Sequence, residues 1–153
     1  MKRRNALKAL AGLGVLAATT PVFANEEGFC NVYKFYRPEI KNRTKMHIKN
    51  PAHPTKGELK HTPEIKIGAK NVKGYTLIEI TLGQKGIIHP STENHWIDFI
   101  ELYVDGKKID IVVFEPGKAM GYAAFNVKLD GAKKVKAVAG CNIHGIWENE
   151  VSL

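Results

Sequence analysis

Short β-strand patterns separated by tight turns fill the second half of this chain, and they limit its fold more than any other feature. Two Asp-Gly dipeptides, Asp105-Gly106 and Asp130-Gly131, are typical of two-residue hairpin turns. The expected strands, rich in β-branched residues, cover residues 64–67, 75–82, 97–104, 107–114, 122–129, 134–139 and 146–151. No convincing amphipathic helix accompanies them. The pattern therefore predicts an all-β chain folded as an antiparallel β-sandwich of six or seven strands.

Residues 1–24 are predicted to be an export signal peptide. Lys2-Arg3-Arg4 is a basic start, residues 9–18 form a short apolar run, and Val22-Phe23-Ala24 resembles a cleavage site. The run is too short to span a bilayer, which needs about 20 apolar residues. The Arg3-Arg4 pair favours the bacterial twin-arginine route, with an ordinary secretory signal as the alternative. We therefore expect a periplasmic protein, and the absence of a lipobox before Cys30 predicts no stable membrane anchor.

The remaining residues, 25–153, are enough for one domain with its own core. The whole chain has 23 basic and 15 acidic residues. The signal holds four of the basic residues and no acidic one, which leaves a net charge of +4. No basic stripe interleaved with aromatic residues is present, so nucleic acid is not an expected partner. A small anion would be favoured modestly.

Cys141 and His144 lie three residues apart between Gly140 and Gly145. A thiolate and an imidazole at this spacing can bind one metal ion from a single tight turn. The same spacing also occurs as buried packing. Moreover, two cysteines in an exported protein usually form a disulfide, so Cys141 could instead pair with Cys30. The pair alone does not decide between these alternatives.

Four of the six histidines occupy places from which they could join Cys141. The six are His47, His53, His61, His89, His95 and His144. His61 precedes the first clear strand, and His89 and His95 flank a polar turn between two strands. Loops at one end of a sandwich can converge although they are distant in sequence.

Taken together, these residues resemble the superoxide reductase (desulfoferrodoxin/neelaredoxin) family over residues 57–147. The motifs are His61-Thr62-Pro63, His89-Pro90 with His95-Trp96-Ile97, and Cys141-Asn142-Ile143-His144-Gly145. The resemblance implies an immunoglobulin-like β-sandwich of about seven strands. It also implies one iron ion (Fe2+/Fe3+) per chain, bound by an axial thiolate and four equatorial imidazoles, with a sixth position open or removably occupied. The implied ligands are Cys141, His61, His89, His95 and His144.

The activity implied by the resemblance is reduction of superoxide by one electron to hydrogen peroxide, without release of oxygen, as a defence against oxidative stress. Four imidazoles and a thiolate exceed the tetrahedral set of structural zinc and suit a redox-active iron. An axial thiolate also donates electron density toward the opposite position. Lys60 corresponds to the family's mobile-loop lysine, where a cation would steer superoxide and order a proton-delivering water.

The chain departs from the family pattern next to Lys60. The family commonly has Glu-Lys-His, and its glutamate can occupy the sixth position in the ferric state. Here Leu59 stands at that place and Glu58 lies one residue earlier. Either Glu58 still reaches the iron or the carboxylate ligand is missing, and superoxide reduction is expected in both cases. His47 and His53 match no motif position and are expected on the surface.

Family members with a second iron centre carry four additional cysteines, whereas this chain has only Cys30. We therefore expect a one-iron form with an external one-electron donor protein, either rubredoxin-like or a periplasmic cytochrome, and a homo-oligomer (dimer or tetramer). Two other hypotheses are an iron-binding electron-transfer or interaction module that uses the same site, and a purely structural sandwich with a Cys30–Cys141 disulfide.

Overall fold

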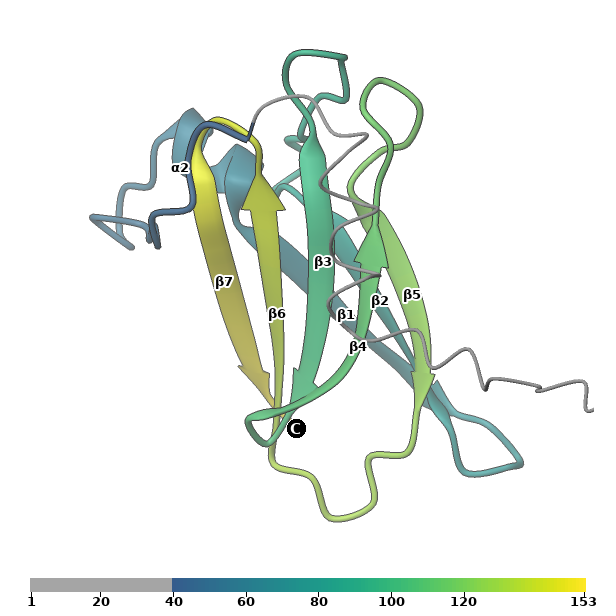
Figure 1. Cartoon of the computed structure of the whole chain (residues 1–153). Helices are drawn as coiled ribbons and strands as arrows, with labels where there is room; N and C mark the ends of the chain where they lie inside the picture. The colour runs from purple at the N-terminus through teal and green to yellow at the C-terminus, as the bar shows by residue number, and fades with distance from the viewer. Residues whose placement is uncertain (1–39) are drawn as a thin grey trace, which may run out of the picture. The chain divides into compact units, whose positions relative to one another are not determined.

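The computed structural model describes residues 40–153, which form two antiparallel sheets (Figure 1). The first sheet has the order β1-β2-β5, with bounds Pro63–Lys70, Thr76–Leu82 and Tyr122–Val127. The second has the order β4-β3-β6-β7, with bounds Lys107–Val113, Ile97–Val104, Lys134–Cys141 and Gly145–Ser152. The predicted seven-stranded antiparallel sandwich is confirmed. The export signal predicted at residues 1–24 and Cys30 lie outside the described residues.

Every expected strand is present, and one short helix that the sequence analysis did not name accompanies them. A six-residue helix, α2 (Lys56–His61), precedes β1. Its N-cap is Thr55, whose side chain accepts from the backbone N–H of Glu58 while Glu58 reaches back to Thr55. This capping box stabilises a helix too short to show an amphipathic period. No helix among residues 40–153 is long and apolar enough to cross a membrane.

The inward faces of both sheets form one apolar core. Alternate residues of β2, including Ile78, Ile80 and Leu82, are fully buried. They pack with Ile100 and Leu102 of β3 in the same cluster. Burying a side chain of this size contributes about 1.5–3 kcal/mol, so the core holds the two sheets together and gives their connecting loops a rigid base.

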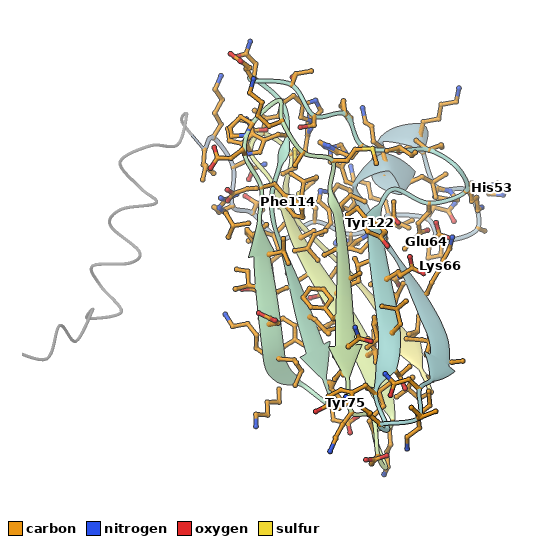
Figure 2. The ribbon with its side chains drawn as sticks, turned by 90° about the vertical axis from the view of Figure 1, so that its right-hand side faces the viewer. His53, Glu64, Lys66, Tyr75, Phe114 and Tyr122 are labelled. Atoms are coloured by element: carbon orange, nitrogen blue, oxygen red, sulfur yellow. The ribbon has the colours of Figure 1, made fainter. Side chains whose placement is uncertain are left out.

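Three connections lie at the same end of the sandwich: α2, the loop between β2 and β3, and the turn between β6 and β7 (Figure 1). His53, in the segment before α2, projects from this end, whereas Tyr75 lies at the opposite end (Figure 2). The predicted convergence of loops therefore occurs, and four of the histidine-bearing positions come from these three connections.

Residues 41–49, called the strap below, run across the β6–β7 turn. The backbone N–H groups of Lys41 and Asn42 both donate to the carbonyl of Asn142, over 2.7 and 3.2 Å. Farther along, the N–H of Ile146 donates to Thr44 and the N–H of Met46 donates to Ile146, each over 2.8 Å. The strap is thus fastened to the turn by main-chain hydrogen bonds.

Gly145 allows the strap to approach the turn. Its φ is +83°, and an added Cβ would lie 2.4 Å from the carbonyl oxygen of Thr44. Gly131 has a similar φ of +73°, but a Cβ there would meet nothing within 4 Å.

These two glycines give a matched prediction. Alanine at either position costs about 1–2 kcal/mol from the left-handed backbone alone. Gly145→Ala should lower the melting temperature clearly more than Gly131→Ala, because only Gly145→Ala displaces the strap. Thermal unfolding followed by circular dichroism measures the difference, and equal shifts would show that the Gly145 contact contributes nothing.

Candidate metal centre

Five residues from the three connections bring their ligand atoms within 4.8 Å of one another. His61 ends α2, and His89 and His95 come from the loop between β2 and β3. Cys141 ends β6, and His144 follows in the turn. These are the five residues that the sequence predicted as ligands, and the structure places all of them together.

The four imidazoles stand around a common centre. Successive ring centroids are 4.7 Å apart for His61 and His89, 4.5 Å for His89 and His95, 4.7 Å for His95 and His144, and 4.6 Å for His144 and His61. Each of these neighbouring pairs is steeply inclined. Across the centre, His61 and His95 are 5.9 Å apart and tilted by only 30°. This is the arrangement of four donors around a square.

Hydrogen bonds select which nitrogen of two rings faces the centre. Nδ1–H of His61 donates to the carbonyl of Gly57 over 2.5 Å, and Nδ1–H of His89 donates to that of Pro90 over 2.7 Å. Such outer bonds fix the tautomer and leave Nε2 as the atom that could bind a metal. Nε2 of His89 is buried and has no hydrogen-bond partner among the described residues. A metal ion would satisfy this otherwise unpaired acceptor.

The spacing of the donor atoms fits a single ion. Nδ1 of His144 lies 3.0 Å from Nε2 of His61 and 3.1 Å from Nε2 of His95. Two nitrogens bound at right angles, each about 2.1 Å from a metal, are about 3.0 Å apart. Sγ of the fully buried Cys141 lies 3.6 Å from Nδ1 of His144 and supplies the fifth donor. Five nitrogen and sulfur donors exceed the four of structural zinc and fit a redox-active iron.

Burial prepares the ligands for metal binding. It lowers the pKa of His61 to about 4 and that of His89 to about 3, and lowers the pKa of His95 and His144 as well. The imidazoles are therefore neutral at neutral pH, as metal ligation requires. Burial raises the pKa of the Cys141 thiol, partly offset by the backbone N–H groups of Ile143 and His144. Metal binding must therefore displace the thiol proton.

Cys141 forms no disulfide within residues 40–153, and its sulfur lies with the four imidazoles; Cys30, the partner in the disulfide alternative, lies outside the described residues. The sulfur of Cys141 also lies 3.9 Å from the side-chain oxygen of Asn142, the next residue.

Asn142 joins the segments that carry the ligands, a role that the sequence analysis did not assign. Its Oδ1 accepts from the N–H of Trp96 over 3.0 Å, and its Nδ2 donates to the carbonyl of Asn94 over 3.0 Å. These bonds hold both neighbours of His95. The side chain is buried, so each hydrogen bond is costly to lose. One indication of this role was available in the sequence, because Asn142 is polar and lies between two predicted ligands.

Trp147 supports the site from the side of the strap. Its ring is stacked on that of His61, with centroids 5.4 Å apart and 21° between planes. Its Nε1–H donates to the carbonyl of His144 over 2.9 Å. One buried indole therefore orients two of the ligand-bearing residues.

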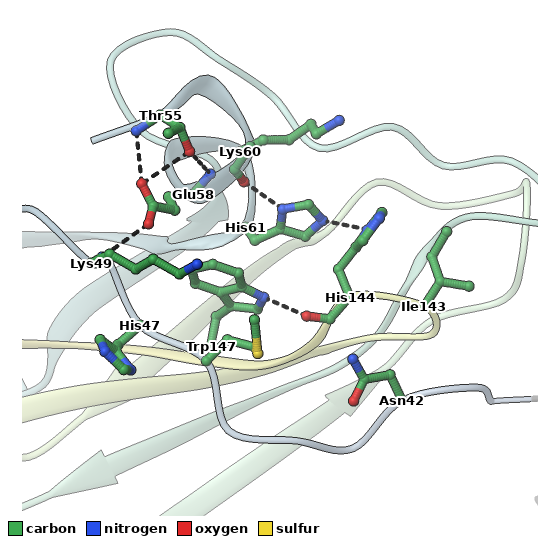
Figure 3. Close-up of a pocket in the computed structure, with 12 residues that line it drawn as sticks. Asn42, His47, Lys49, Thr55, Glu58, Lys60, His61, Ile143, His144 and Trp147 are labelled. Carbon is green, nitrogen blue, oxygen red and sulfur yellow. Dashed lines mark hydrogen bonds between the residues drawn. The ribbon is translucent and has the colours of Figure 1, made fainter. Parts of the chain in front are cut away.

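Glu58 is engaged elsewhere (Figure 3). Its carboxylate accepts from the backbone N–H groups of Lys49 and Thr55, over 2.9 and 2.8 Å, and from the Thr55 hydroxyl over 2.9 Å. These bonds lower the pKa of Glu58. The carboxylate is not among the five clustered groups, and the Leu59 side chain is buried. The residues in this part of α2 thus serve the helix cap and the core.

Lys60 is half-buried, and its charge contributes to lowering the pKa of all five clustered groups. Its ammonium group therefore acts on the centre electrostatically. His47 and His53 are exposed and are not part of the cluster, in agreement with the sequence prediction.

The depressed pKa values predict how the metal-free protein responds to acid. In the unfolded chain the imidazoles titrate near 6.5, so below about pH 6.5 the unfolded chain binds more protons. Stability should therefore fall as the pH drops from about 6.5 toward the folded-state values of about 4 for His61 and about 3 for His89. Thermal unfolding of the metal-free protein at several pH values tests this. His89→Leu should flatten the pH dependence and His53→Ala should not, and an equal slope in all three proteins would contradict the assignment.

Comparison with known proteins gives matches over the same region. A family model described as Desulfoferrodoxin matches residues 52–150. The desulfoferrodoxin of Nitratidesulfovibrio vulgaris is 40% identical over 91 residues, which cover 60% of this chain and 62% of that protein. The superoxide reductase of Pyrococcus horikoshii is 36% identical over 107 residues, which cover 64% of this chain and 90% of that protein. This chain thus spans less than two thirds of the first relative and most of the second.

A solved structure is similar as well. The superoxide reductase (1Fe-SOR) from Giardia intestinalis aligns with a TM-score of 0.53 and 32% identity, covering 61% of this chain and 98% of that chain. The residues matched by the family model include all five clustered groups and Lys60.

Proposed function

Since the chain belongs to the desulfoferrodoxin family, we propose that it is a superoxide reductase. The reaction joins superoxide, one electron and two protons to give hydrogen peroxide. The main support for the proposal is that the ligand atoms of four imidazoles and one cysteine lie within 4.8 Å of one another. This donor set suits a redox-active iron. Superoxide reductases among its relatives support the same conclusion.

One iron ion, alternating between the ferrous and ferric states, would supply the electron. His61, His89, His95 and His144 would hold it through Nε2 of the first three and Nδ1 of the last. Cys141 would hold the metal from the buried side through its thiolate sulfur, which would supply electron density to it. His144 is exposed, so the centre is reached from the solvent side.

Lys60 attracts the substrate and assists protonation. A cation beside the centre raises the local concentration of a small anion and speeds its encounter. Lys60 can also order a water molecule that delivers a proton to the departing product. Its electrostatic effect on all five ligands supports this role.

Glu58 would not hold the metal. Glu58 is bonded to two backbone N–H groups and one hydroxyl, and removing it from them would open the cap of α2. Leu59 offers no donor atom. A small anion from solvent could thus approach the five donors without displacing the Glu58 carboxylate.

The visible spectrum tests the metal and its thiolate ligand. Purified protein should contain one iron per chain and show a thiolate-to-ferric absorption band in the visible. Reduction should bleach this band, and superoxide should restore it by taking one electron from the ferrous form. Cys141→Ser should lose the band and the activity, whereas His53→Ala should keep both.

A colourless protein that contains zinc or no metal would refute the proposal. A protein that keeps the band but does not react with superoxide would instead be an electron-transfer module built on the same site.

Kinetics tests Lys60. Lys60→Ala should retain the iron but slow the reaction with superoxide by about tenfold at low salt, and it should flatten the ionic-strength dependence. Lys73→Ala, which removes an exposed lysine from the β1–β2 turn, is the matched control. Stopped-flow mixing with superoxide at several salt concentrations measures both, and an unchanged rate would remove Lys60 from the mechanism.

Two substitutions separate ligation from capping at Glu58. Glu58→Gln keeps a side chain that can complete the capping box, whereas Glu58→Ala does not. We expect the ferric spectrum of both variants to match that of the parent protein, and only Glu58→Ala to lower the melting temperature, by a few degrees. A shifted ferric band in Glu58→Gln would show that the carboxylate binds the iron.

We further propose that the protein works in the periplasm after twin-arginine export. The support is the basic start and short apolar run within residues 1–24. Cell fractionation and N-terminal sequencing of the mature protein test this proposal. Replacing Arg3 and Arg4 by Lys should leave the protein in the cytoplasm.

A further inference from the structure

We infer that the strap and the cleft beside it form the docking surface for an acidic one-electron carrier protein. The inference rests on the proposed function, because superoxide reduction consumes one electron per turnover that must come from outside the chain. The electron would enter at this surface, and the partner that brings it would carry a negative charge.

The charge of the described chain is concentrated in one short segment. Residues 40–60 contain six basic residues and one acidic residue, whereas residues 61–153 contain eleven of each. The single acid is Glu58, whose carboxylate is occupied by backbone N–H groups and a hydroxyl. All of the net positive charge of residues 40–153 therefore lies before His61.

The lysines of the strap face solvent. Lys41, Lys45 and Lys49 are exposed, whereas Asn42 and Met46 between them are half-buried. None of the three lysines forms an ion pair with another residue of 40–153. Main-chain hydrogen bonds to the β6–β7 turn hold the strap in place, so these charges are presented on an ordered backbone.

A cleft of about 430 Å³ lies between the strap, α2 and the metal centre (Figure 3). Met46 and Lys49 line it from the strap, and Ile143 and Trp147 line it from the β6–β7 hairpin. Two lysines, Lys49 and Lys60, are also in the lining, and apolar side chains beside lysines form a surface on which an acidic protein can both orient and pack.

The cleft reaches the metal centre directly. Two of the clustered imidazoles, His61 and His144, are among its lining residues. Trp147, also in the lining, is stacked on His61. A carrier seated here would therefore lie against two ligand rings, and its electron would pass to the ferric centre while the carrier is oxidised by one electron.

The strap lies before residues 52–150, the part of the chain that the family model matches. The strap lysines thus come from sequence outside that match, whereas most of the residues that line the cleft lie within it. An acidic protein is favoured over a membrane, because a concave cleft beside a redox centre suits a small convex carrier better than a flat lipid surface.

Direct binding tests the inference. The probe is a rubredoxin, a small acidic one-electron carrier, and basic cytochrome c is the opposite-charge control. The tested variant combines Lys41→Gln, Lys45→Gln and Lys49→Gln, and the matched control combines Lys66→Gln, Lys73→Gln and Lys107→Gln, three exposed lysines of residues 61–153. Biolayer interferometry on the full mature chain, iron-loaded and zinc-substituted, measures affinity without relying on turnover.

We expect the parent and the control variant to bind rubredoxin in a salt-dependent manner, and the strap variant to bind it about tenfold or more weakly. Electron transfer from reduced rubredoxin should slow in parallel, whereas the reaction of pre-reduced protein with superoxide at physiological salt should change far less. That second rate reports on the proposed function independently of docking.

Equal weakening in the two variants would overturn the inference, as would equal binding of cytochrome c. Strap-dependent binding to phosphatidylglycerol vesicles without binding to rubredoxin would overturn it in favour of a membrane surface. Strap-dependent self-association in sedimentation velocity, again without rubredoxin binding, would overturn it in favour of a second copy of this chain.

Discussion

The metal centre depends on the hydrogen bonds that join the β6–β7 turn to its neighbours, and Asn142 makes most of them. Its side chain holds the loop that carries His95, and its carbonyl receives two N–H groups of the strap. Cys141 and His144 flank it. Because Asn142 is buried, none of these bonds can be exchanged for bonds to water without a large cost. The ligands from β6, from the turn and from the β2–β3 loop are therefore positioned together.

The β-sandwich brings the other connections of the site to the same end as the β6–β7 turn. A core of fully buried aliphatic residues fixes the ends of β2, β3 and β6, so that three connections distant in sequence share one end. Outer hydrogen bonds from His61 and His89 then aim the remaining nitrogens inward. The apolar core and the outer hydrogen bonds together place five donor atoms around one point.

Positive charge has two separate uses around this centre. Lys60 acts on the five ligands and suits attraction of a small anion at close range. The strap lysines lie farther along the chain on an exposed surface and suit recognition of a larger acidic partner. In the proposed mechanism, substrate and electron donor would thus approach through different groups of the same protein.

The sequence by itself determined the strands and the set of candidate ligands. Strand runs and Asp-Gly turns are local signals, because backbone preference and alternation act over a few residues. The five clustered residues could be named because their motifs resemble those of the superoxide reductase family, and their residue types agree with the chemistry of iron binding.

Only the tertiary structure decided which nitrogen of His61 faces the centre, what Glu58 does and where the strap lies. His61 bonds to Gly57 only because a short helix forms, and Glu58 is occupied by Lys49, nine residues away. The strap pairs with a turn about 100 residues later, and no local pattern encodes such a partner.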